Sequence, residues 1–271
     1  MSTINTNMSS LNAQRNITKS AGELSNSMTR LSSGLRVNSA KDDAAGLSIA
    51  TKMDSQIRGM SQASRNANDG ISLIQTADGA LSNIGDALQR IRELAVQGAN
   101  GTNGDDEWAN INTEVQELND EITRISEQTK FNGNAVLSQA GTTKDIQVGA
   151  DAAQTITVTF GAASDFSNLT IADIADETTS TAVITQMDEA LKALNTERAS
   201  LGTAQNRMGY AISNLATSIE NQSAAKSRIM DTDYAAETSK LSRSQILQQA
   251  GTAMLAQANS APNSVMSLLR G

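Results

Sequence analysis

Apolar residues recur along this chain at alternating spacings of three and four, the period of helices that pack as coiled coils. The period predicts five amphipathic helices, two of them about 45 residues and so on the order of 70 Å long. We therefore expect a mainly α fold of long antiparallel helices forming a coiled-coil-like rod. The stripes are Ile17, Ala21, Leu24, Met28, Leu31 and Leu35; Ala50 to Ala95; Ile111 to Ile125; Ile184 to Ile229; and Leu247, Ala250, Met254, Ala258, Ala261, Val265 and Leu268.

Residues 130–175 interrupt the helical period. The Phe131-Asn-Gly133 segment is typical of a turn, and Ile146 and Val148 alternate with polar neighbours as half-buried strands do. Ile156, Val158 and Phe160 repeat that alternation. We expect a small β element of one or two hairpins here, with Thr- and Ser-rich loops around 141–144 and 176–181.

The segment between the first two predicted helices offers Lys41, Asp42 and Asp43 as candidate chemistry. A Lys/carboxylate active site would need a complementary cluster and a proton shuttle, and the chain has no histidine. Local structure explains the segment better. Gly34 suits the left-handed end of the first helix, and Ser39-x-x-Asp42 matches a capping box that opens the second. We interpret Gly34, Ser39 and Asp42 as a domain joint.

The composition removes most catalytic chemistry. The chain has no histidine and no cysteine, which excludes the commonest metal ligand, the commonest general base and the thiol nucleophile. Gly101 and Gly104 are spaced too loosely for a phosphate loop, and no Gly-Lys-Ser/Thr follows them. The sequence therefore predicts no catalytic residue, metal site or cofactor, and an enzyme is the least favoured class.

Charge is distributed unevenly along the chain, whose net charge is −8. Residues 1–40 hold four basic and one acidic residue, residues 226–271 hold five and three, and the middle holds 12 and 25, net −13. An acidic middle and weakly basic ends argue against a nucleic-acid partner. No apolar run approaches the ~18 residues of a membrane span, and residues 1–30 lack the apolar core of a cleavable signal peptide.

The two end segments are single amphipathic helices with small residues on their stripes. An isolated helix of this kind is marginal in water. We expect the two ends to pair with each other and with other copies of the chain.

One face of the second predicted helix has two interpretations. Leu88, Ile91 and Ala95 belong to the core stripe, so Arg90 and Leu94, one turn apart, form a mixed charged and apolar patch off the core. The patch is either a solvated face with an Arg90–Glu93 pair or a protein contact, in which arginine is favoured. Periodicity does not choose between them. The residues left off the stripe are Gln89, Arg90, Arg92, Glu93, Leu94 and Gln97.

Several long motifs occur in an order that resembles the bacterial flagellin family, the subunits of the flagellar filament. The motifs are Ile4-Asn-Thr-Asn7, Leu31-Ser-Ser-Gly-Leu-Arg36, Asn38-Ser-Ala-Lys-Asp-Asp-Ala-Ala-Gly46, Arg65-Asn-Ala-Asn-Asp69, Gln89-Arg-Ile-Arg-Glu-Leu-Ala-Val-Gln97, Gln128-Thr-Lys-Phe-Asn-Gly133, Asn206-Arg207, Ala256-Gln-Ala-Asn259 and Ser267-Leu-Leu-Arg270.

The resemblance implies three regions. Residues 1–40 and 229–271 would pair as an inner coiled-coil domain, and residues 41–228 would form a helical rod domain with its β-hairpin element around 130–175. The large outer domains of many relatives have no room here. The implied function is a self-assembling extracellular filament for motility, exported without a cleavable signal peptide.

The resemblance also implies partners and contact residues. Arg90, Leu94 and Glu114, with Gln89 and Gln97 nearby, match the region that the vertebrate flagellin-sensing Toll-like receptor recognises and that packs along the filament. Further implied partners are an export chaperone, the export apparatus, and the filament cap and hook-junction proteins. A hook–filament junction protein, which shares the paired ends, is the alternative class. The C-terminal patch implied for the chaperone and for cytosolic immune sensors is Val265, Leu268, Leu269 and Arg270.

Overall fold

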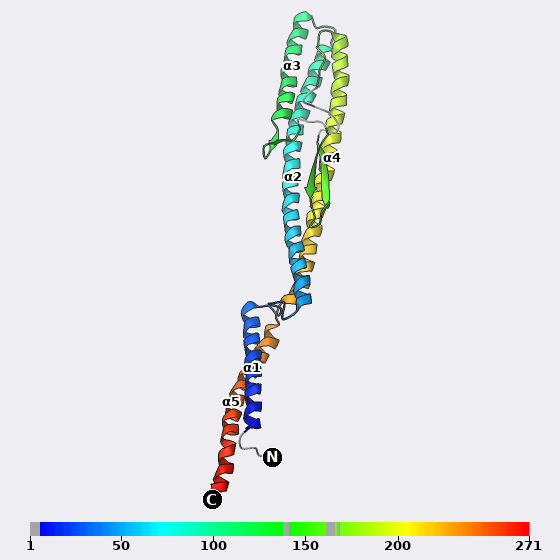
Figure 1. Cartoon of the computed structure of the whole chain (residues 1–271). Coiled ribbons are helices and arrows are strands. Elements are labelled where there is room, and N and C mark those ends of the chain that lie inside the picture. Colours follow the sequence, from blue (N-terminus) through cyan, green and yellow to red (C-terminus); the bar gives the residue numbers. More distant parts are fainter. Residues whose placement is uncertain (1–5, 138–140, 161–165, 167–168, 271) are drawn as a thin grey trace. The chain divides into compact units, whose positions relative to one another are not determined.

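The computed structural model describes residues 6–137, 141–160, 166 and 169–270, with side chains as far as residue 260. It is mainly helical, as predicted, with long helices and two short hairpins (Figure 1). The helices are α1 (Met8–Ser33), α2 (Ala44–Gly98), α3 (Asp105–Gln128), α4 (Glu177–Met230) and α5 (Tyr234–Arg270). The strands are β1 (Lys130–Phe131), β2 (Asn134–Ala135), β3 (Thr142–Gln147) and β4 (Thr155–Phe160).

The chain divides into two compact units. The terminal unit comprises residues 1–55 and 221–271, and the central unit comprises residues 56–220. Both α2 and α4 begin in one unit and end in the other.

In the terminal unit, α1 and α5 lie side by side and antiparallel (Figure 1). At one end the Asn7 side-chain amide donates to the carbonyl of Ala258 at 2.7 Å. At the other end the Tyr234 hydroxyl donates to the carbonyl of Leu31 at 3.3 Å. The predicted pairing of the first and last helices is confirmed.

The segment that follows α1 is hydrogen-bonded to the segment that precedes α5. Gly34 ends α1 in the left-handed conformation, with φ 72°, and its N–H donates to Arg30, as its position predicted. The Arg36 N–H donates to the carbonyl of Met230 at 2.6 Å, and the Thr232 N–H donates to that of Gly34 at 2.9 Å. The two connections therefore form one hydrogen-bonded joint.

The predicted start of the second helix is wrong by about one turn. Ser39 and Asp42 close a turn of their own, in which the Asp42 carboxylate accepts the Ser39 N–H at 2.9 Å. Helix α2 begins at Ala44, where the Asp43 carboxylate accepts the Gly46 N–H at 2.8 Å, three residues on. Asp42 and Asp43 are adjacent in the sequence, and Asp43, not Ser39, is the residue that caps α2.

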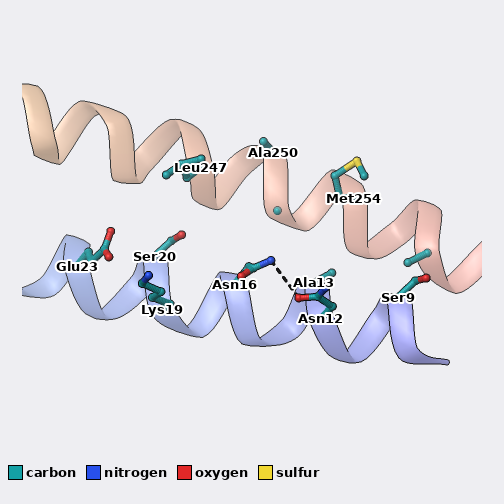
Figure 2. Close-up of a pocket in the computed structure, with 12 residues that line it drawn as sticks. Ser9, Asn12, Ala13, Asn16, Lys19, Ser20, Glu23, Leu247, Ala250 and Met254 are labelled. Carbon is teal, nitrogen blue, oxygen red and sulfur yellow. Dashed lines mark hydrogen bonds between the residues drawn. The ribbon is translucent and has the colours of Figure 1, made fainter. Parts of the chain in front are cut away.

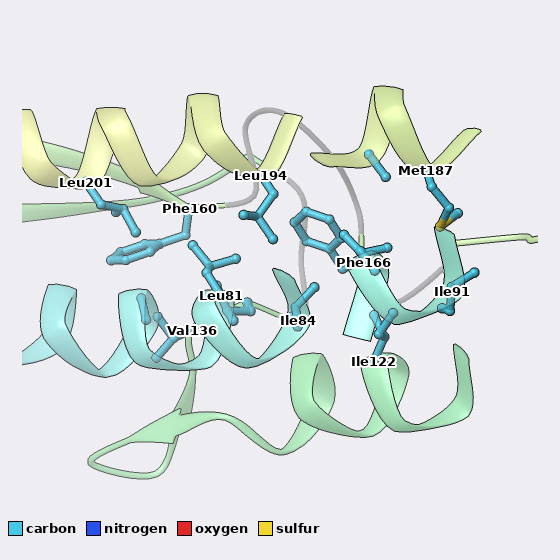
Figure 3. Packing of buried hydrophobic residues seen from close by; sticks show 14 of the residues in the cluster. Leu81, Ile84, Ile91, Ile122, Val136, Phe160, Phe166, Met187, Leu194 and Leu201 are labelled. Atoms are coloured by element: carbon cyan, nitrogen blue, oxygen red, sulfur yellow. The ribbon is translucent and has the colours of Figure 1, made fainter. Parts of the chain in front are cut away.

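In the central unit, one hydrophobic core joins α2, α3, α4 and β4. Figure 3 shows Phe160 of β4 between Leu81 of α2 and Leu201 of α4. Along β4 the alternating side chains of Ile156, Val158 and Phe160 are buried, which confirms the predicted period of two. The strand therefore closes the core that the three helices leave open.

The β element consists of two antiparallel hairpins. Asn132 and Gly133 both have positive φ, 49° and 80°, as a two-residue hairpin turn requires. The predicted flanking loops are wrong, because Thr142 begins β3 and Glu177 begins α4. The Asp176 carboxylate accepts the Thr179 N–H at 2.7 Å, and this cap starts α4 within a Thr-rich stretch.

Candidate functional site

The contact between α1 and α5, here called the terminal seam, repeats every three and four residues. Its positions on α1 include Ser10, Ala13, Ile17, Ser20, Leu24, Ser27 and Leu31. Its positions on α5 are Glu237, Leu241, Ser244, Gln248, Gly251, Leu255 and Ala258. Its most deeply buried members are polar, namely Ser10, Ser20, Ser27, Glu237 and Ser244.

Small residues let the two helices of the seam approach closely. A Cβ added at Gly251 would lie 2.7 Å from Cγ1 of Ile17, so that glycine receives the isoleucine side chain.

A buried carboxylate lies where the seam meets the joint. The Ser27 hydroxyl donates to the Glu237 carboxylate at 2.6 Å, and the Lys240 ammonium lies 3.2 Å from it. The Ser27 hydrogen bond, with a smaller contribution from Lys240, lowers the pKa of Glu237 below its ordinary value. This charged group links the start of α5 to the end of α1.

Several large apolar side chains of the two helices lie outside the seam and are exposed. Ile17, Leu24 and Leu31 are half-buried in it, whereas Met28 and Met254 are 58% and 64% exposed. The predicted stripe is therefore wrong for these two methionines in the α1–α5 pairing, because the seam runs through other positions of both helices. Their role in assembly stays a prediction. The exposed set is Met8, Leu11, Met28, Ile246, Leu247 and Met254.

A groove of about 600 Å³ runs along one side of the terminal seam. Figure 2 shows Leu247, Ala250 and Met254 of α5 and the polar side chains of α1 that line the groove with them. The α1 wall includes Ser9, Asn12, Asn16, Lys19 and Glu23. One wall is apolar and the other polar, so the groove fits an amphipathic surface.

The predicted C-terminal contact residues cannot be placed. Val265, Leu268, Leu269 and Arg270 belong to the end of α5, where the side chains lie outside the described residues. Ile4 also lies outside them.

In the central unit, Arg90 of α2 bridges to α3. Its guanidinium lies 2.8 Å from the Glu114 carboxylate and 3.3 Å from that of Glu93. The hydrogen bonds to Glu114 and then to Glu93 raise the pKa of Arg90 above its ordinary value. The structure thus joins Arg90 and Glu114 in one exposed ion-pair cluster, with Gln89 and Gln97 exposed on the same helix.

Leu94 does not belong to this exposed patch. It is 3% exposed and part of the central core, so its predicted position off the core is wrong. Both α3 and α4 pack on α2, and the apolar face of α2 is therefore wider than a single stripe. The exposed apolar residue in this stretch is Val96, which the sequence reasoning missed.

The candidate Lys/Asp chemistry of the joint is local structure. Hydrogen bonds from Ser39 and then from the Asn38 N–H lower the pKa of Asp42, and Asp43 caps α2. Among the residues that the structure describes, no cluster of acidic side chains could hold a metal ion. Within the same ranges, no helix has the length and hydropathy needed to cross a membrane.

Two family models match the chain. The bacterial flagellin N-terminal helical region matches residues 4–142, and the bacterial flagellin C-terminal helical region matches residues 184–269. A flagellin of Halalkalibacterium halodurans is 46% identical over 270 residues, covering 98% of this chain and 99% of that protein. A flagellin of Xenorhabdus nematophila is 44% identical over 311 residues, covering 99% of each.

Among solved structures, the crystal structure of Bacillus cereus flagellin is 37% identical, with a TM-score of 0.49. That match covers 56% of this chain and 88% of the other. The sequence matches, which span nearly the whole chain, are the stronger comparison.

Proposed function

The chain belongs to the bacterial flagellin family, and from this premise we propose which of its surfaces build the filament. As a flagellin it is a structural subunit of the extracellular flagellar filament and not an enzyme. We propose that residues 1–40 and 229–271 form the inner coiled-coil domain and that residues 41–228 form the rod domain. The outer apolar face of α1 and α5 is then covered by other copies.

One observation supports this proposal most strongly. The terminal seam buries serines and a glutamate, while leucine, isoleucine and methionine side chains stay exposed on the same two helices. Contiguous exposed apolar residues mark an interaction surface, and Leu247, Ala250 and Met254 line one groove. Leu247 and Met254 line the groove beside the seam and belong to the exposed set, so we propose that this side of α5 contacts a different surface of the next copy. Contacts of that kind, repeated without closure, give an open helical polymer.

The critical concentration for polymerisation tests the proposal. A leucine contributes about 1.5–3 kcal/mol when it is fully buried, and Leu247 is 47% exposed in the single chain. Leu247→Ser therefore loses about 1 kcal/mol of assembly free energy, roughly a five-fold rise in critical concentration. Gln249→Ser, at an exposed polar position of the same helix, is the matched control and leaves it unchanged. Equal values for both variants would contradict the proposal.

A second proposal concerns the exposed ion-pair cluster of Arg90, Glu93 and Glu114. We propose that it is a contact surface along the filament and the surface that the vertebrate flagellin-sensing Toll-like receptor binds, with Gln89 and Gln97 at its edges. Its support is geometric, since a half-exposed arginine held between two carboxylates is pre-positioned for a partner. Arg90→Ala should reduce both receptor signalling and filament growth. Unchanged signalling and growth would remove this proposal.

The other partners follow from the family. We propose an export chaperone and the export apparatus as partners before assembly, with the filament cap and hook-junction proteins as neighbours afterwards. Export without a cleavable signal peptide belongs to the same proposal. A hook–filament junction protein stays the alternative. Quantitative mass spectrometry of isolated flagella separates them, because a filament subunit is the most abundant chain and a junction protein is a trace component.

A further inference from the structure

The exposed methionines of the chain are concentrated on its terminal helices. Of the methionines whose side chains the structure describes, Met8, Met28 and Met254 are exposed, by 63%, 58% and 64%. Met187 and Met208, by contrast, are fully buried in the central core. An oxidant in solution therefore meets the thioethers of α1 and α5 first.

The chemistry at such a thioether is a two-electron oxidation. The sulfur lone pair attacks one oxygen of hydrogen peroxide, and the O–O bond breaks. The transferred oxygen gives its proton to the second oxygen, which leaves as water. The product is methionine sulfoxide, in which an apolar side chain has become a polar acceptor. Methionine sulfoxide reductases reverse the change.

Met254 is placed where this change matters most. It lies on the apolar wall of the groove with Leu247 and Ala250 (Figure 2). In the free subunit a sulfoxide there is solvated, so the fold loses nothing. Once another copy covers the wall, the sulfoxide oxygen must give up its water, and an unpaired buried acceptor is costly.

We propose that Met254, together with Met28 and Met8, is an oxidation site through which a peroxide prevents a free subunit from entering the filament. The proposal rests on the proposed function, because another copy must cover the α1–α5 face. It predicts an asymmetry: subunits are sensitive to peroxide before assembly and protected after it.

The test compares dissociated subunits with intact filaments at one dose of hydrogen peroxide. Mass spectrometry of peptides gives the sulfoxide fraction at each methionine, and seeded polymerisation gives the critical concentration. The variants are Met254→Leu, which keeps the volume of the side chain, and the triple variant Met8→Leu/Met28→Leu/Met254→Leu.

The expected results are specific. Met8, Met28 and Met254 are oxidised in free subunits before Met187 and Met208, and they are protected in filaments. Oxidation raises the critical concentration of the unmodified sequence about ten-fold, the triple variant shows no rise, and sulfoxide reductase restores assembly.

Two outcomes would overturn the proposal while leaving filament formation intact. One is equal oxidation of Met254 in subunits and in filaments, and the other is an unchanged critical concentration after oxidation. If untreated protein formed no filaments, the proposed function itself would fail, and the oxidation proposal with it.

Discussion

Replacing Ser27 with alanine removes the shorter of the two polar contacts made by the buried Glu237 carboxylate. Glu237 is 5% exposed and accepts the Ser27 hydroxyl at 2.6 Å. The remaining contact is with Lys240, whose side chain is 57% exposed and whose attraction is therefore screened by solvent. A hydrogen bond to a charged group is worth about 1.5–3 kcal/mol. The pairing of α1 with α5 should thus weaken by about 2 kcal/mol, roughly thirty-fold.

Hydrogen exchange measures this loss, because amide protection reports local opening. In Ser27→Ala the protected amides of α1 and α5 should exchange roughly thirty-fold faster. Ser25→Ala is the matched control, since Ser25 is exposed on the same helix and the change in helix propensity is the same. If the two variants had equal protection, the Ser27–Glu237 contact would not stabilise the pair.

The same contact sets a pH dependence. The pKa of Glu237 lies below its ordinary value of 4.5, so the folded state favours the carboxylate. Its stabilisation is complete above pH 4.5 and is lost as the pH falls through the lowered pKa. In Ser27→Ala the pKa returns toward the ordinary value, and acid should therefore lower the amide protection factors, corrected for the intrinsic exchange rate, less than in the parent. An identical acid response in both proteins would refute the reasoning.

Two further predictions concern packing and the exposed cluster. Gly251→Ala places a Cβ 2.7 Å from Cγ1 of Ile17 and should destabilise the α1–α5 pair by about 1–3 kcal/mol in urea unfolding. Gly22→Ala is the control, because no atom lies within 4 Å of the added Cβ. It should stabilise α1 by about 0.5–1 kcal/mol. Leu94→Ala should lower the unfolding free energy of the central unit by about 2–5 kcal/mol. Arg90→Ala should leave the unfolding midpoint nearly unchanged and affect only contacts with partner molecules. Equal midpoints for both variants would contradict the buried position of Leu94.

Periodicity was enough to predict most of the architecture. The large apolar residues of the central unit, such as Leu81, Leu201 and Met208, are buried where the stripes place them. The alternation at Ile156 and Val158 identified a strand for the same reason. In both cases the core is made of large apolar side chains, and their spacing shows which face is buried.

The terminal helices show where that logic fails. Their seam includes Ile17, Leu24 and Leu31 of the predicted stripe, half-buried. Its most deeply buried positions are small and polar, such as Ser20 and Ser27, and a search for large apolar residues does not find them. The stripe containing Leu247 and Met254 is exposed and lines the groove beside the seam. It lies outside the contact within the chain, and we propose it as a surface for another copy.

The Arg90 patch was only partly predictable. The stripe through Leu88 and Ile91 identifies one buried face of α2, but Leu94, outside that stripe, also belongs to the core, and the period of a single helix cannot show a second buried face. Pairing Arg90 with Glu114 required the fold, because the two residues lie on different helices. The first residues of α2 and α4, Ala44 and Glu177, could not be predicted, because several neighbouring Asp, Ser and Thr residues could each form the N-terminal cap.

The most direct test of the central claim is the reactivity of a single cysteine placed at position 247. The chain has no cysteine of its own, so Leu247→Cys gives one labelling site on the exposed face of α5. A maleimide reagent should label it readily in free subunits and slowly in filaments, with full reactivity restored on dissociation. Equal labelling rates in subunits and filaments would show that other copies do not cover this face, and would contradict the account.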